Sequence, residues 1–286
     1  MKKQIHKVDP GCLALLPFLI IVLTYELMPL LELIGSSLVG KTSGKIGLEN
    51  FIKVFTAPLY QQSILNSIRI SVISSLIGIV VAFFGARYCT EAGEKGRKLY
   101  TMILNMTSNF SGVPLAFAFM VLMGNTGVLT MIGHRFGIPF LKDFNLYSGS
   151  GVLLTYIYFQ IPLATLLLIP SFRGIHREWR EAAEILHAGA ADYWFRIVIP
   201  NLLPDLLGTL SVLFANALAA YATAYALMMN NYALLSLQIT SKYKGDVQID
   251  KATGGALAVV MILLMVAMTM LNNYFTGRGS KGRDLI

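Results

Sequence analysis

Six long apolar runs constrain the fold of this 286-residue chain more than any other feature. A helix of about 20 apolar residues can cross the hydrocarbon core of a bilayer, and only helices or closed barrels satisfy their backbone hydrogen bonds there. With 55% hydrophobic and 13% charged residues, the composition agrees with membrane insertion. We therefore expect an all-α membrane protein with six transmembrane helices. Their expected bounds are 13–34, 64–86, 101–123, 151–170, 206–229 and 254–275. The first half of the third run is polar.

Lysine and arginine residues are unevenly divided between the loops on the two sides of these runs. With the N-terminus inside, fourteen lie on the cytoplasmic side and eight on the outer side. This bias predicts that both termini are cytoplasmic. The first apolar run is long enough to span and has no small-x-small cleavage site before Glu26, so we expect an uncleaved first helix. The charge bias also accounts for much of the net charge of +8. Because the basic residues follow the membrane edges, we expect no nucleic-acid partner.

The stretch GSSLVGKT (35–42) has the letters of a phosphate-binding loop, G-x-x-x-x-G-K-[ST]. That loop requires a preceding β-strand and a helix that begins near its lysine. Here it follows a membrane helix and falls on the outer side, so we interpret it as a loop without nucleotide. The four histidines are scattered, and no His/Cys cluster has metal spacing. We expect neither a metal site nor catalytic activity in this chain.

The segment REWREAAEILHAGAADYWFRIVIPNLLP (177–204) is far more charged than its surroundings. Its first part predicts an amphipathic helix with Trp179, Ala183 and Leu186 on one face. Gly189 can stop this helix, and a second one begins near Asp192. A projecting helix of this kind suits docking to a soluble partner. The alternative is a helix that lies on the lipid surface.

One pattern in this segment resembles a known signature. Glu181-Ala182-Ala183, then Ala188, Ile197, Ile199 and Pro200, is similar to the "EAA" signature of permease subunits of binding-protein-dependent ABC importers. The similarity extends from about Gln62 to Phe275. Two positions differ: His187 replaces the glycine of the family, and Ile199 replaces its leucine. The turn at that glycine either stays at His187 or moves to Gly189, because His tolerates left-handed conformations better than most residues do.

The resemblance implies a type I ABC importer permease (MetI-like) fold with a cytoplasmic coupling helix, in a prokaryotic inner membrane. It implies an N-terminal part, 1–61, that holds the tail, the first transmembrane helix and an outer loop. The transmembrane domain then spans 62–275 and includes a loop at 173–203, named the coupling loop below. A cytoplasmic tail, 276–286, follows.

The resemblance also implies partners. They are a cytoplasmic ATPase dimer that holds ATP and magnesium, an extracytoplasmic solute-binding protein, membrane lipid and a second permease subunit. That subunit is identical or, as we favour, different. The chain itself would carry no cofactor. The residues expected to couple it to the ATPase are Glu181, Ala182, Ala183, Leu186, His187, Gly189 and Pro200.

The solute path is less clearly marked. Thr209, Asn216, Thr223 and Asn230 recur every seven residues in the fifth run, which predicts a polar stripe on one helix face. This stripe either lines a solute path or hydrogen-bonds neighbouring helices. Glu26, in the middle of the first run, is either a structural ion-pair partner or a solute contact. The path candidates are Glu26, Asn216, Tyr221, Thr223 and Tyr225.

The sequence marks the class of solute only weakly. The chain looks most like permeases for polyamines, phosphonates, sulfate and ferric ion, and an acidic, Tyr-rich path weakly favours a polyamine. The alternative function is a secondary transporter driven by an ion gradient. Such a transporter would leave the coupling loop unexplained.

Overall fold

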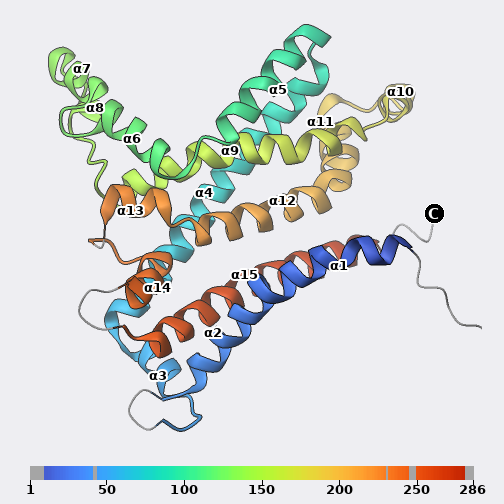
Figure 1. Ribbon diagram of the computed structural model, residues 1–286. Coiled ribbons are helices and arrows are strands. Elements are labelled where there is room, and N and C mark those ends of the chain that lie inside the picture. Colours follow the sequence, from blue (N-terminus) through green and yellow to red (C-terminus); the bar gives the residue numbers. More distant parts are fainter. Residues whose placement is uncertain (1–9, 41–43, 230, 245–248, 281–286) are drawn as a thin grey trace, which may run out of the picture. The chain divides into compact units, whose positions relative to one another are not determined.

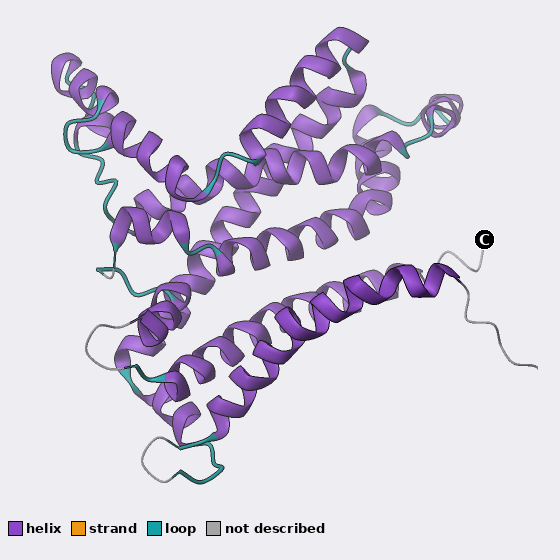
Figure 2. Ribbon diagram, viewed as in Figure 1, coloured by secondary structure: helices purple, strands orange, loops and turns teal. Residues whose placement is uncertain are grey.

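The computed structural model describes residues 10–40, 44–229, 231–244 and 249–280, and every regular element in these ranges is a helix (Figures 1 and 2). Six helical segments are long and apolar enough to cross a membrane, which confirms the predicted all-α, six-span architecture. These segments are Leu15–Leu38, Pro58–Glu91, Gly112–Phe136, Gly149–Arg173, Ala190–Ala219 and Lys251–Phe275.

The chain forms two compact units. Unit 1 comprises Met1–Ala57 and Ile239–Val260, and unit 2 comprises Pro58–Gln238 and Met261–Ile286. Two helices, α14 (Leu235–Lys244) and α15 (Lys251–Ser280), contribute to both units.

Unit 1 begins with the first candidate span. Its elements are α1 (Pro10–Val22), the π-helical turn η1 (Leu23–Leu27), α2 (Met28–Leu38) and α3 (Glu49–Thr56). Large apolar side chains along this span are exposed, among them Phe18 at 65% and Leu31 at 66%. A run of exposed apolar residues of this length is expected where lipid or another membrane protein covers a helix.

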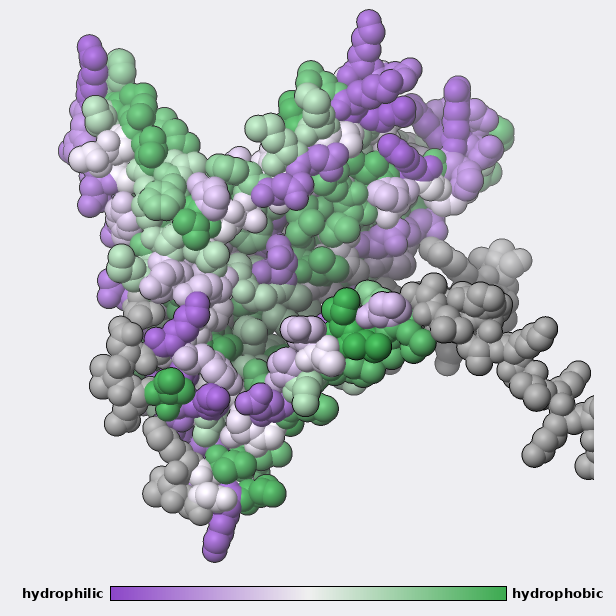
Figure 3. Space-filling view, viewed as in Figure 1, coloured by the Kyte–Doolittle hydropathy of each residue, from purple (hydrophilic) through white to green (hydrophobic). Residues whose placement is uncertain are grey.

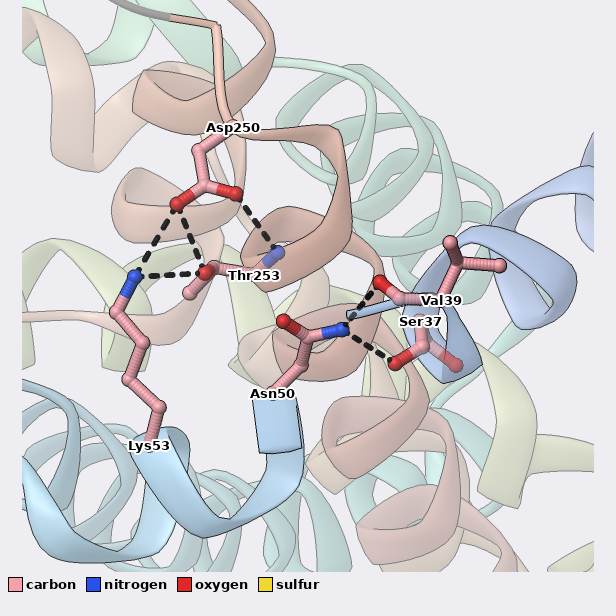
Figure 4. A network of polar contacts seen from close by, with 6 residues as sticks. All are labelled: Ser37, Val39, Asn50, Lys53, Asp250 and Thr253. Carbon is pink, nitrogen blue, oxygen red and sulfur yellow. Dashed lines mark hydrogen bonds and ion pairs between the residues drawn. The ribbon is translucent and has the colours of Figure 1, made fainter. Parts of the chain in front are cut away.

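Polar contacts close the end of α2 (Figure 4). The Asn50 side-chain amide on α3 donates hydrogen bonds of 2.9 Å to both the Ser37 and the Val39 carbonyl oxygens. The last carbonyls of an α-helix have no partner within the helix, so these bonds satisfy groups that would otherwise be left without one. Asn50 and Ser37 are both buried.

A second set of contacts fixes the start of α15 (Figure 4). The Thr253 N–H donates to Asp250 Oδ1 at 3.2 Å, so Asp250 acts as an N-cap. Lys53 Nζ, on α3, donates to Asp250 Oδ2 at 3.2 Å and to Thr253 Oγ1 at 3.0 Å. These contacts tie the start of α15 to α3 within unit 1.

Burial of the Asp250 carboxyl favours its neutral form, but the hydrogen bonds from Thr253 and Lys53 favour the carboxylate more strongly. The pKa of Asp250 therefore lies below its ordinary value. A carboxyl whose pKa is lowered by folding stabilises the fold above its unfolded-state pKa. That stabilisation is lost as the pH falls through the folded-state pKa.

We predict that Asp250→Asn, which keeps an N-cap oxygen and removes the charge, lowers stability by up to about 1 kcal/mol at pH 7. The difference from wild type should shrink as the pH falls toward 3. Thermal unfolding of the purified chain at several pH values measures this difference in stability. Glu49→Gln, which removes the acidic group in the first turn of α3, is the matched control and should change little at any pH. A difference for Asp250→Asn that persists at pH 3 would contradict the ion-pair account.

Unit 2 is built on a long helix pair, α4 (Pro58–Glu91) and α9 (Gly149–Arg173). The buried face of α4 consists mostly of small residues, which let two helices approach closely in a membrane. These residues are Ser67, Ser71, Ser74, Ser75, Gly78, Ala82 and Ala86. A Cβ added at Gly78 would lie 3.2 Å from the Gln160 Cβ. The buried Gln160 amide on α9 donates to Ser74 Oγ at 2.9 Å and to Ser75 Oγ at 3.1 Å.

The remaining helices of unit 2 are mostly short. They are α5 (Glu94–Ser108), α6 (Gly112–Met123), α7 (Val128–Phe136), α8 (Pro139–Lys142), α10 (Arg177–Ile185), α11 (Ala190–Asp192), the π-helical turn η2 (Tyr193–Val198), α12 (Ile199–Ala219) and α13 (Ala222–Met228). The α12 helix packs against both α4 and α9, α5 packs against α9, and α13 packs against α6. Figure 3 shows hydrophobic surface over α6 and hydrophilic residues around the α4–α5 turn and α10.

The predicted bounds of two spans were wrong. The third run, 101–123, is divided between α5 and α6, and the candidate span is Gly112–Phe136. The fifth run, 206–229, is interrupted at residues 220–221, and its candidate span is Ala190–Ala219. Gly112 has a φ of +71°, which a regular helix does not allow, so the chain changes direction there.

Candidate functional site: the coupling loop and the crossing of two broken spans

The coupling loop presents a short helix, α10, beyond the end of α9 (Figure 1). Two ion pairs at (i, i+4) spacing support the helix: Arg177 Nε to Glu181 Oε1 and Arg180 Nε to Glu184 Oε1, both at 3.1 Å. All four side chains are largely exposed, so each pair contributes only a few tenths of a kcal/mol.

A Schellman motif ends α10. The Ala188 N–H donates to the Ala183 carbonyl at 2.9 Å, and the His187 N–H donates to the Glu184 carbonyl at 3.0 Å. His187 takes the left-handed conformation that this motif requires, with a φ of 54°. Gly189 has an extended φ of −69°. The turn therefore stays at His187 and does not move to Gly189.

The Schellman motif explains the small side chains at two of the signature positions, Ala183 and Ala188. Ala183 is 3% exposed and lies on the face of α10 that is turned toward Ala188 and Gly189. We predicted that Trp179, Ala183 and Leu186 share one apolar face, but Ala183 is buried whereas Leu186 is 79% exposed, so that prediction was wrong. Periodicity alone does not show that the chain folds back over this face.

The outward surface of α10 has a different composition. Glu181 and Ala182 are exposed, and Ile185 and Leu186 are the most exposed apolar residues of the loop, at 78% and 79%. Sequence reasoning missed Ile185, although its spacing of three residues from Ala182 and four from Glu181 places it beside both.

The second half of the loop joins α10 to the fifth span. Gly189 is the N-cap of α11, and the expected capping residue, Asp192, instead pairs with Arg196 at 3.1 Å. The chain continues through η2 into α12, where Pro200 occupies one of the first helical positions. Because η2 runs directly into α12, Pro200 removes one backbone hydrogen bond at this junction.

The loop rests on the end of α4. Arg87 donates from Nε to Glu91 Oε1 at 2.9 Å, and its Cζ lies 4.4 Å from the centroid of the Trp194 ring. Trp194 also contacts the Phe83 ring edge-on at 6.0 Å. A cavity of about 770 Å³ separates this contact from the inner face of α10. The η2 turn contacts both α10 and α12, and through Trp194 it contacts α4.

A second candidate site lies where the two broken spans meet. The α5 helix ends at Ser108, and α12 ends at Ala219. The Thr223 hydroxyl, in the first turn of α13, donates to the Gly112 carbonyl at 3.2 Å. A Cβ added at Gly112 would meet the Ala222 Cβ at 3.6 Å.

A cavity of about 360 Å³ lies at this crossing. It is lined by Ser108, Ser111, Gly112, Phe159, Leu163, Asn216, Ala220, Tyr221, Ala222 and Thr223. The structure thus brings together three predicted path residues, Asn216, Tyr221 and Thr223. Tyr225 stacks on Tyr221, with ring centroids 5.2 Å apart, but does not line the cavity. The sequence analysis missed Ser108, Ser111 and Gly112, although the polar first half of the third run was a signal for them.

The structure also bears on two further predictions, the polar stripe of the fifth run and the role of Glu26. The seven-residue stripe does not lie on one continuous helix face, because the helix breaks between Asn216 and Thr223. Thr209 is buried, and Asn230 lies outside the described residues. Glu26 belongs to unit 1, where it is exposed on η1 and makes no ion pair with a described residue of that unit.

The family is shown by comparison with known proteins. Residues 74–280 match the model of the binding-protein-dependent transport system inner membrane component. The chain belongs to this family of ABC importer permeases. It is a multi-pass permease of the inner membrane that is not itself catalytic, and the nucleotide is bound and hydrolysed by a separate subunit.

Its relatives serve different solutes. The chain is 24% identical over 258 residues to a probable sulfate transport system permease protein, cysT, from Helicosporidium sp. subsp. Simulium jonesii, covering 88% of this chain and 90% of the relative. It also superposes on a chain of a bacterial alginate ABC transporter, solved with an alginate-bound periplasmic protein. The TM-score is 0.72, with 18% identity and 93% of each chain covered. A chain of the methionine transporter MetNI gives a TM-score of 0.58 at 14% identity, covering 77% of this chain and 96% of that one.

We predict that His187→Gly is tolerated, with a stability change within about 1 kcal/mol, because glycine suits the left-handed position but gains freedom in the unfolded chain. His187→Val should destabilise the loop by at least about 1 kcal/mol. Gly189→Ala should be nearly neutral, since its φ is ordinary and only Asp192 Oδ2 approaches, at 3.8 Å. The rate of limited proteolysis within 177–200 measures each effect. Greater damage from Gly189→Ala than from His187→Val would place the turn at residue 189.

Proposed function

We propose that this permease forms one part of a solute path and receives ATP-driven motion from a partner ATPase through the coupling loop. The observation that carries the proposal is the shape of α10. On its inner face Ala183 is buried under the turn of the Schellman motif, whereas Glu181, Ala182, Ile185 and Leu186 form an exposed outward surface. A small, rigid helix with an exposed apolar and acidic face suits a groove on a soluble protein.

The proposed partners follow from the family and from the exposed surfaces. An ATPase dimer would bind the outward face of α10 on the cytoplasmic side, which places both termini of the chain in the cytoplasm. A solute-binding protein would dock on the opposite side. A second permease subunit, different from this one, would cover part of the apolar surface that lies exposed on the spans.

The proposed solute path passes the cavity at the crossing of the broken spans. Interrupted helices near the middle of a membrane domain occur where a transporter binds its solute, because the ends of the helices leave polar backbone groups for it. Hydroxyl, amide and aromatic groups line this cavity, and none of its lining residues is charged.

The lining bears on the class of solute. The weak preference for a polyamine required a carboxylate, Glu26, in the path. The lining of the cavity contains no acidic residue that would support a polyamine as the solute. We therefore limit the proposal to a small polar solute, of the broad group that includes polyamines, phosphonates and inorganic ions.

We predict that Glu181→Lys weakens the association with the ATPase by about 10-fold or more, because a charge-assisted hydrogen bond contributes about 1.5–3 kcal/mol. Ile185→Asp should have a similar effect. Co-purification of the complex and ATP-dependent uptake measure the loss. Glu94→Lys is the matched control, because it also reverses a charge in an exposed (i, i+4) pair, the 2.8 Å pair with Lys98.

The control complex should keep its ATPase subunits. Normal uptake with the ATPase still bound in both Glu181→Lys and Ile185→Asp would contradict the proposed coupling role of α10.

A further inference from the structure

A basic pocket of about 450 Å³ lies on α5, beside the end of α9, and takes no part in the functions proposed above. Its lining consists of Arg97, Lys98, Thr101, Met102, Asn105 and Arg173. The first five come from α5, and Arg173 is the last residue of α9. Because α5 packs against α9, the pocket belongs to a fixed helix contact within unit 2.

Helical spacing aligns the polar groups of the pocket. Arg97, Thr101 and Asn105 follow one another at four-residue intervals, so their side chains form a row along one face of α5. Arg173 faces this row from the second helix. The pocket therefore presents two guanidinium groups, an ammonium group, a hydroxyl and an amide, and all of these donate hydrogen bonds.

The positive charge of the pocket is only partly balanced. Lys98 pairs with Glu94 at 2.8 Å, but Arg97 and Arg173 make no ion pair with a described residue of unit 2. A planar guanidinium group binds phosphate oxygens in two parallel hydrogen bonds, which makes such a pair a typical phosphate site.

Apolar surface adjoins the basic groups. Met102, which lines the pocket, is 63% exposed, and the nearby Leu99, Ile103 and Met106 are 56%, 50% and 80% exposed. Figure 3 shows the same change from hydrophilic to hydrophobic surface along α5. Charged groups at a helix end followed by exposed apolar residues match the two parts of a phospholipid.

We propose that this pocket binds the phosphate headgroup of an anionic phospholipid in the cytoplasmic leaflet, with the acyl chains along Met102 and its apolar neighbours. The pocket lies at the membrane edge from which the coupling loop projects, since Arg173 ends α9 at the first position of that loop. Basic pockets between membrane helices at this edge bind anionic headgroups. The leaflet assignment rests on the orientation proposed above, whereas the ligand chemistry does not.

The full-length chain, purified in detergent and titrated with phosphatidylglycerol or phosphatidylcholine, tests the proposal by native mass spectrometry of the bound lipid. Wild type should bind phosphatidylglycerol at least about five-fold more tightly than phosphatidylcholine. Arg97→Gln and Arg173→Gln should each weaken this binding about five-fold, as expected for one basic group near a membrane surface. Arg97→Lys, which keeps the charge, should lose less affinity for phosphatidylglycerol than Arg97→Gln does.

Lys95→Gln is the matched control, because Lys95 is an exposed cation of the first turn of α5 that does not line the pocket. It should change the affinity less than two-fold, and all variants should keep the melting temperature of wild type without lipid. Equal binding of the two lipids, or an equal loss in Lys95→Gln, would overturn the proposal. Displacement of the lipid by inorganic phosphate at constant ionic strength would assign the pocket to a soluble anion instead.

Carboxylate groups of a protein partner are the remaining alternative. If Arg97→Gln and Arg173→Gln released the ATPase from the complex in lipid-free detergent, the pocket would be a protein contact. Because the lipid titration involves neither ATP nor solute, its failure would leave the importer function untouched.

Discussion

Every polar backbone group inside a membrane needs a partner, and this requirement applies in unit 2 where two of the apolar runs are interrupted, at residues 109–111 and 220–221. The Ala220 carbonyl, just beyond the end of α12, accepts hydrogen bonds from the Tyr156 hydroxyl at 2.6 Å and from the Ser236 hydroxyl at 3.2 Å. The Gly112 carbonyl accepts one from Thr223. Side chains thus supply donors to these two carbonyls, one at each break. The breaks also leave room for the cavity beside Asn216.

The same arrangement links the two candidate sites. The candidate span Ala190–Ala219 begins in the coupling loop and ends at the cavity, so one helical element connects the loop with the proposed solute path. In the proposed mechanism, a displacement of the loop would be transmitted along this element because a helix resists compression and bending. The Arg87–Trp194 contact holds the loop end of the element against α4. A rigid helical connection of this kind suits a mechanism in which rigid groups of helices rock about a fixed solute site.

Much of this fold could be predicted from sequence, because the thickness of the bilayer sets the length of each apolar run. The spacing from Glu181 to Pro200 also identified the family. The helix breaks could not be placed, since the bond that joins Gly112 to Thr223 spans 111 residues. The burial of Ala183 depends on a turn in which a histidine, in place of glycine, adopts a positive φ. Hydrophobic periodicity contains no signal for either feature.

The central claim is that the crossing of the two broken spans is a water-accessible path. Cysteine labelling tests it most directly, in a chain whose Cys12 and Cys89 are replaced by serine and that is assembled with its partners. Ser111→Cys and Asn216→Cys should react with a small, water-soluble thiol reagent, because thiolate forms only where water reaches. Val80→Cys, on an exposed apolar part of α4, should stay unreactive. If Ser111→Cys and Asn216→Cys proved as unreactive as Val80→Cys in every nucleotide state, the crossing would be helix packing alone and the account would be wrong.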